Sequence, residues 1–174
     1  MEWALKEAEQ LFTQARFTAE IAESKGMDVD AVALLSAVMS CAWGIGSNYT
    51  FCVMSVDQIS TQGEKGDAEK TKGAAQSLAA GILNIWEFAE RMAGYARGIT
   101  GNRASLGKKI ERRAERICDK ALKACEELKR SVSNPYKAKS KELIRLFAEM
   151  KRFFKTMTDI EQALAEERRA ILEA

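Results

Sequence analysis

Apolar residues recur every three or four positions along most of the chain, which is the spacing of one face of an α-helix. Pro135 is the single proline, so the strongest helix breaker is missing almost everywhere. We therefore expect an all-α protein, an elongated bundle of four to five long helices. The predicted helices cover approximately residues 2–25, 29–60, 67–99, 105–132 and 136–173.

The expected helix over 67–99 carries the most regular apolar stripe of the sequence. Spacing by three and four that is sustained along a helix predicts coiled-coil-like packing against a neighbour at a shallow angle. The stripe consists of Ala75, Leu78, Ile82, Ile85, Ala89, Met92, Ala96 and Ile99, widened by Ala79, Trp86 and Ala93.

Similar stripes mark the last two expected helices. Over 105–132 the stripe is Ile110, Ala114, Ile117, Ala121, Ala124 and Leu128. Over 136–173 it is Leu143, Phe147, Met150, Phe154, Met157, Leu164 and Ile171, with Leu146, Phe153 and Ile160 alongside. Glu161 and Arg168 interrupt this last stripe, which indicates that the final turns meet water, a partner or an ion pair on a facing helix.

The segment from Ala31 to Val56 contains no charged residue. A helix of that length could span a bilayer with a hydrocarbon core of about 30 Å. Its many Ser, Thr and Asn residues are unfavourable toward lipid, and Gly44 and Gly46 suggest a kink or turn near 44–47. A buried central helix is favoured over a subunit interface or a membrane-inserted segment. The candidate interface residues are Trp43, Tyr49, Phe51, Trp86, Glu161 and Arg168.

Polar stretches predict the connections between helices. The segment Thr61–Lys72 is polar with two glycines and predicts a loop, in which Asp67 caps the next helix. Ser105 is the expected cap of the helix over 105–132, after glycines that break the chain.

The composition is that of a globular protein, with 174 residues, 47% hydrophobic and 30% charged. We expect residues 1–174 to form a single helical domain.

Four cysteines show no C-x-x-C pair, which favours reduced, packed thiols. Acidic and basic residues interrupt the start of the chain and disfavour a cleaved signal peptide, so the cytoplasm is the default location. Export without a cleaved signal and packaging into a particle stay open.

The net charge of +2 hides an asymmetry. Residues 1–102 carry 8 Lys and Arg against 13 Asp and Glu, a net −5, whereas residues 103–174 carry 19 against 12, a net +7. Solvated helix faces, nucleic-acid contact by residues 103–131 and attraction between neighbouring copies would all produce this split. Interspersed acids and the lack of interleaved aromatics weaken the nucleic-acid hypothesis. The candidate phosphate contacts are Lys108, Lys109, Arg112, Arg113 and Arg116.

The sequence has no histidine, which excludes Ser-His-Asp and Cys-His catalysis and most zinc and haem sites. Glu87 and Glu90 cannot complete a Glu-x-x-His di-iron motif. Residues 101–109 depart from a phosphate-binding loop in spacing and lack Ser or Thr after the lysine. We expect no catalytic, cofactor-binding or metal-binding residues, and a protein that is not an enzyme.

The leading hypothesis is therefore a non-enzymatic structural or interaction protein, a helical bundle that assembles with copies of itself as a filament, coat or scaffold component. A membrane-active helical hairpin that inserts 31–56 and 73–99 is the first alternative, although the charged tip between them makes crossing costly. A nucleic-acid-binding adaptor that uses the basic helix over 103–131 is the second.

Overall fold

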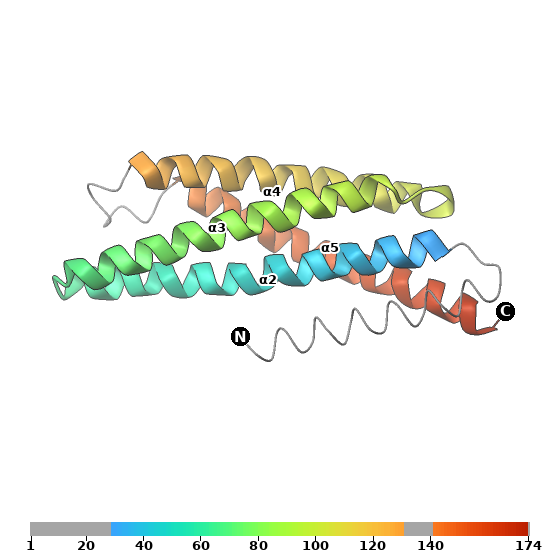
Figure 1. Ribbon diagram of the computed structural model, residues 1–174, viewed down its shortest axis with the longest axis horizontal. Helices are drawn as coiled ribbons and strands as arrows, with labels where there is room; N and C mark the ends of the chain where they lie inside the picture. The colour runs from blue at the N-terminus through green and yellow to red at the C-terminus, as the bar shows by residue number, and fades with distance from the viewer. Residues whose placement is uncertain (1–28, 131–140, 174) are drawn as a thin grey trace.

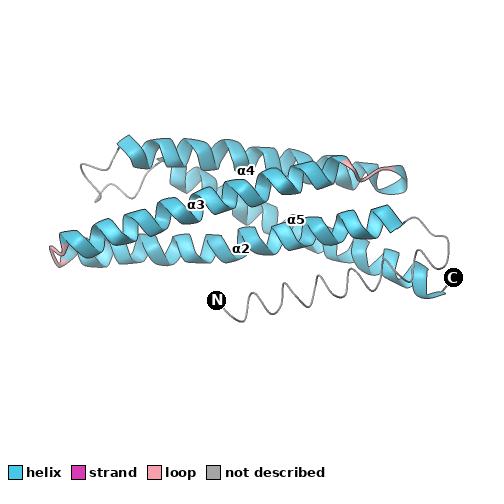
Figure 2. Ribbon diagram, viewed as in Figure 1, coloured by secondary structure: helices cyan, strands magenta, loops and turns pink. Residues whose placement is uncertain are grey.

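The computed structural model describes residues 29–130 and 141–173 of the chain. This part is all-helical, and its four helices pack in a ring in which each contacts the next and α5 contacts α2 (Figure 1). Consecutive helices run in opposite directions, and α5 crosses behind the others (Figures 1 and 2). The helices are α2 (Val29–Glu64), α3 (Ala68–Arg97), α4 (Ala104–Arg130) and α5 (Lys141–Glu173), with a short 3-10 helix, η1 (Gly101–Arg103), before α4.

The predicted all-α bundle is confirmed by this arrangement. The expected helix over 2–25 lies outside the described residues, as does the beginning of the one expected over 136–173.

The turn between α2 and α3 is shorter than the predicted loop over Thr61–Lys72, because helix continues on both sides of it. Gly66 has φ +71°, a left-handed conformation that glycine adopts without strain. The carboxylate of Asp67 accepts a hydrogen bond from the Lys70 backbone amide at 3.1 Å, so Asp67 is the predicted N-cap of α3.

α2 passes Gly44 and Gly46 without a break, so the turn suggested near 44–47 is absent. A Cβ atom on Gly44 would lie 2.7 Å from the Phe88 ring of α3. Gly81 of α3 is similarly restricted, because its Cβ would lie 2.7 Å from Cys52 Sγ. These glycines allow α2 and α3 to approach closely, and between them Asn84 Nδ2 donates to Asn48 Oδ1 at 3.1 Å.

The expected cap at Ser105 is wrong. α4 begins at Ala104, directly after η1, and Ser105 already lies in its first turn. The chain reverses through Gly101, which has φ +60°.

The core consists largely of the predicted stripes. The stripe positions from Leu78 to Ala96 on α3 are buried, as is Ile99 just after that helix, and on α4 those from Ile110 to Ala124 are buried. On α5 both predicted rows contribute to the core, although Phe147, Phe154 and Met157 of the main stripe are only partly buried. The buried side chains of α5 are Leu143, Leu146, Met150, Phe153, Ile160, Ala163 and Leu164, with Glu149 and Thr156.

Candidate functional site: the exposed face of α2

One side of α2 is buried in the bundle, and the opposite side is exposed without a charged residue between positions 40 and 54. Trp43 is 45%, Phe51 46% and Met54 58% exposed, which is unusual for large apolar side chains gathered on one helix face. We call this surface the α2 face. It consists of Ser40, Trp43, Ser47, Thr50, Phe51 and Met54.

Packing on both flanks fixes the orientation of α2. On the α5 side, the Tyr49 ring contacts Phe147 and Phe154 edge-on, with centroids 5.2 and 5.5 Å apart. On the α3 side, Cys52 Sγ donates to the Leu78 carbonyl at 3.9 Å. Because these flanks are fixed, α2 cannot rotate to bury its exposed face within the described bundle.

The predicted interface residues do not form one surface. Trp43 and Phe51 lie on the α2 face, whereas Tyr49 packs between α2 and α5. Trp86 is half-buried beside α4, where its carbonyl accepts a bond from Cys118 Sγ at 3.7 Å. Glu161 is exposed on α5, and the Arg168 side chain lies outside the described residues.

Sequence reasoning missed Met54 and the three hydroxyl residues of the α2 face. Their spacing from Trp43 in the sequence could have indicated that they lie on the same helix side. Positions 43, 47, 50 and 54 recur at the three-and-four spacing of one helix side. The hydroxyls among them add hydrogen-bonding capacity, although Thr50 Oγ1 already donates to the Gly46 carbonyl at 3.3 Å.

The candidate phosphate contacts on α4 separate into two groups. Lys109 pairs with Asp159, and Arg113 Nη1 lies 3.0 Å from Glu149 Oε1, so both residues connect α4 to α5. Lys108, Arg112 and Arg116 are exposed and have no ion pair within the described part of the chain. We call these three residues the α4 ridge.

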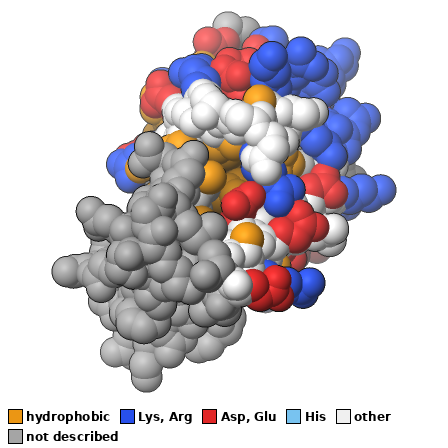
Figure 3. Space-filling view, turned by 90° about the vertical axis from the view of Figure 1, so that its right-hand side faces the viewer, with side chains coloured by type: hydrophobic (Ala, Val, Ile, Leu, Met, Phe, Trp, Pro, Cys, Tyr) orange, Lys and Arg blue, Asp and Glu red, His pale blue; other side chains and the backbone are white. Residues whose placement is uncertain are grey.

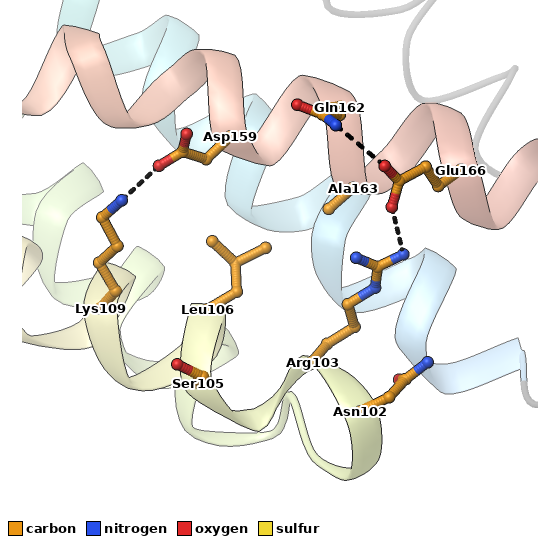
Figure 4. Close-up of a pocket in the computed structure, with 9 residues that line it drawn as sticks. All are labelled: Asn102, Arg103, Ser105, Leu106, Lys109, Asp159, Gln162, Ala163 and Glu166. Atoms are coloured by element: carbon orange, nitrogen blue, oxygen red, sulfur yellow. Dashed lines mark hydrogen bonds and ion pairs between the residues drawn. The ribbon is translucent and has the colours of Figure 1, made fainter.

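A cavity of about 420 Å³ lies between the start of α4 and α5 (Figure 4). Its charged side chains already pair with one another, since Arg103 bonds to Glu166 at 2.8 Å and Lys109 to Asp159. Arg103 also bonds to Glu167 at 2.9 Å, and these carboxylates raise its pKa. We therefore interpret the cavity residues as a connection between α4 and α5.

The four cysteines are free thiols; Cys118 is half-buried and the other three are buried. Burial raises the pKa of Cys41 to about 11, that of Cys52 to about 12 and that of Cys118 to about 11. Thiols with such pKa values are protonated at neutral pH and are poor nucleophiles. No cluster of three or more potential metal ligands occurs in residues 29–130 and 141–173.

By length and composition, one helix in the described ranges, Ala31–Glu64, could cross a membrane. A core helix of a soluble protein can have the same length and composition, and one side of this helix is buried in the bundle.

The chain matches no family model, and comparisons with curated proteins and with solved structures gave no match either. The class of this protein is therefore defined by the fold of its described residues, which is an all-helical bundle.

Proposed function

We propose that the protein is a non-enzymatic structural subunit that assembles with copies of itself through the α2 face. The observation that carries this proposal is the exposure of Trp43, Phe51 and Met54 on one uncharged helix side. Exposed apolar surface of this kind is typical of contacts with another protein or a membrane. The other exposed large apolar residues, Leu83, Tyr95, Leu122 and Ile144, are spread over three helices.

A second copy is the occupant that fits the residue order of the α2 face. If two α2 helices pair antiparallel about a twofold axis at Ser47, each Trp43 meets Phe51 of the other copy, and each Ser40 meets Met54. A small residue at the axis permits close approach, and aromatic pairs are frequent in the centres of interfaces. Antiparallel pairing also places opposite ends of the helix dipoles together.

The size of the face predicts a dimer that depends on concentration. Large side chains bury about 150–250 Å² each, so the exposed fractions of the three apolar residues leave roughly 300 Å² of apolar surface. A stable interface buries about 800 Å² per partner. The α2 face therefore forms the apolar centre of the contact, and the adjoining parts of α3 and α5 form its rim.

The proposal includes three further expectations. We expect coiled-coil-like packing of the stripe on α3, a fifth helix over 2–25, and a cytoplasmic location. We also expect the dimer to be the building unit of a filament, coat or scaffold. Assembly beyond the dimer requires a second contact between copies.

Native mass measured by light scattering over a range of protein concentration and salt tests the proposal. We expect a shift from monomer to dimer in the wild type and a monomer in the W43E/F51E variant. The matched control is L122E/I144E, which introduces the same charges at exposed apolar positions on α4 and α5. Circular dichroism verifies that both variants are folded. A wild type that stays monomeric at every concentration, or equal loss of the dimer in both variants, would overturn the proposal.

A cross-linking experiment tests the geometry of the pairing. In the variant S47C, the new thiols lie at the twofold axis, and mild oxidation should produce a disulfide-linked dimer. T158C, exposed on α5, is the control and should remain largely monomeric. Cross-linking at position 158 that equals that at position 47 would exclude the twofold arrangement.

Insertion into a membrane is the alternative that the apolar character of α2 favours. The exposed side of α3 carries Glu87, Glu90 and Arg91, which are costly in a hydrocarbon core. Sedimentation with vesicles of neutral lipid separates the two proposals. Protein that stays in the supernatant and dimerises supports self-assembly, and protein that sediments with the vesicles contradicts it.

A further inference from the structure

The α4 ridge is a row of three positive charges on the outward side of α4. Lys108, Arg112 and Arg116 follow one another at intervals of four residues, so successive side chains lie about 6 Å apart along the helix. Like charges at this spacing repel one another. In Figure 3, Lys and Arg side chains gather along the upper right margin, at the level where α4 lies in Figure 1.

The nearby acids of α4 are held by other cations. Arg97 of α3 bonds to Glu111 at 2.7 Å and to Glu115 at 3.3 Å, and these bonds raise its pKa. Asp119 bonds to Lys120 and to Lys123, with the shortest distances 3.0 and 2.8 Å. Glu111, Glu115 and Asp119 therefore form their ion pairs with cations other than the three ridge residues.

We infer that the α4 ridge binds the phosphate backbone of double-stranded nucleic acid. Guanidinium groups bind phosphate oxygens in a bidentate manner, and two of the three ridge residues are arginines. A duplex carries one negative charge per approximately 1.7 Å of its axis, so a row about 12 Å long faces several phosphates. Contacts of this kind hold a duplex without reading its sequence.

The composition of α4 favours a duplex over the other polyanions. α4 contains no aromatic residue, and binding of single strands relies on stacking of bases on aromatic rings. An acidic partner surface on a second copy is disfavoured, since the acids on α3 and at its start alternate with bases, as in the pairs Asp67–Lys70 and Glu87–Arg91.

Fluorescence anisotropy with a labelled short DNA duplex tests the inference with the full-length protein. Three phosphate contacts give a slope of log affinity against log salt of about −2.7, which corresponds to a roughly 40-fold loss of affinity when salt rises fourfold. We expect K108Q/R112Q/R116Q to lose most of the binding and of the salt dependence. The control K65Q/K72Q/R91Q removes the same charge at exposed positions of the α2–α3 hairpin and should bind like the wild type.

Three outcomes would overturn the inference. They are unchanged binding in the ridge variant, equal loss in the control variant, and binding to anionic vesicles but not to DNA. The monomeric W43E/F51E variant separates this test from that of self-assembly, because it keeps the α4 ridge intact. Its binding to a duplex too short for two ridges should equal that of the wild type.

Discussion

A methyl group at Gly107 would have no space in the α3–α4 corner. Its Cβ would lie 2.8 Å from the Ala96 carbonyl oxygen, and 3.0 Å from both the Cβ and the carbonyl oxygen of Ile99. Two of these three atoms belong to the backbone, so they cannot move aside by a rotamer change. Gly107→Ala therefore requires a shift of the start of α4 relative to the end of α3.

The magnitude follows from two opposing effects. Replacing glycine by alanine inside a helix stabilises it by about 1 kcal/mol, and forcing extra atoms into a packed site costs roughly 1–3 kcal/mol. Gly94→Ala is the matched control, since Gly94 lies in α3 and nothing occupies the 4 Å around its Cβ position. Gly94→Ala should be more stable than the wild type by about 0.5–1 kcal/mol. The difference between the two variants, about 1–3 kcal/mol, is the cost of the steric conflict.

Urea unfolding followed by circular dichroism measures both free energies, provided that the transition is two-state. The expected order of stability is Gly94→Ala, wild type, Gly107→Ala. If Gly107→Ala is as stable as Gly94→Ala, the packing described for the α3–α4 corner is incorrect.

Three further predictions concern single groups. Asp67→Ala should lower the melting temperature more than Asp67→Asn, because asparagine keeps an oxygen acceptor for the Lys70 amide. The same hydrogen bond lowers the pKa of Asp67. Its contribution to stability is therefore present at neutral pH and is lost as the pH falls through the lowered pKa. At pH 8, Cys41 and Cys52 should be alkylated far more slowly in the folded protein than in urea, because burial raises both pKa values to about 11 or above. Peptide mass analysis locates the alkylated cysteines. Equal rates in the folded protein and in urea would contradict the burial of these two thiols. Glu149→Leu should destabilise the protein by roughly 1–3 kcal/mol in urea unfolding, because Arg113 then loses its acceptor on α5. An unchanged midpoint would show that this ion pair contributes little.

The helices could be predicted well where one apolar row is clearly separated from polar ones. α3 and α4 come nearest to this condition. Most of their predicted core positions are buried, and the exceptions, Ala75, Ala79, Trp86 and Leu128, are partly buried. On α5 two adjacent rows are apolar. Periodicity does not decide between them. In the structure α5 packs against both α2 and α4, and among its described side chains both rows are buried except at Phe147, Phe154 and Met157, which are partly buried.

The ends of the helices were less predictable than their existence. Asp67 was predicted correctly because a side-chain cap leaves a local signal. Ser105 has the same signal, but the short η1 helix positions the start of α4 one residue earlier. The glycines at 44 and 46 suggested a bend, whereas contact with Phe88, which is far away in the sequence, accounts for Gly44.

The surfaces could be predicted only in part. Within the uncharged segment nearly every position is apolar or small, so the sequence does not distinguish the outward Trp43 from the packed Tyr49. Likewise, the five basic residues of α4 look equivalent in sequence. Only the arrangement of helices shows that Asp159 and Glu149 engage two of them and leave the ridge exposed.

The two proposed surfaces lie on helices that are not neighbours in the ring, because α2 contacts α3 and α5 but not α4 within the described residues. A dimer joined through the α2 face would therefore keep both α4 ridges accessible. Two linked ridges bind one long duplex more tightly than one ridge does, because the second contact becomes intramolecular. We expect the wild type to gain affinity with increasing duplex length, and the W43E/F51E variant to gain much less. Equal gains in both proteins would mean that self-assembly and nucleic-acid binding are not coupled through this arrangement.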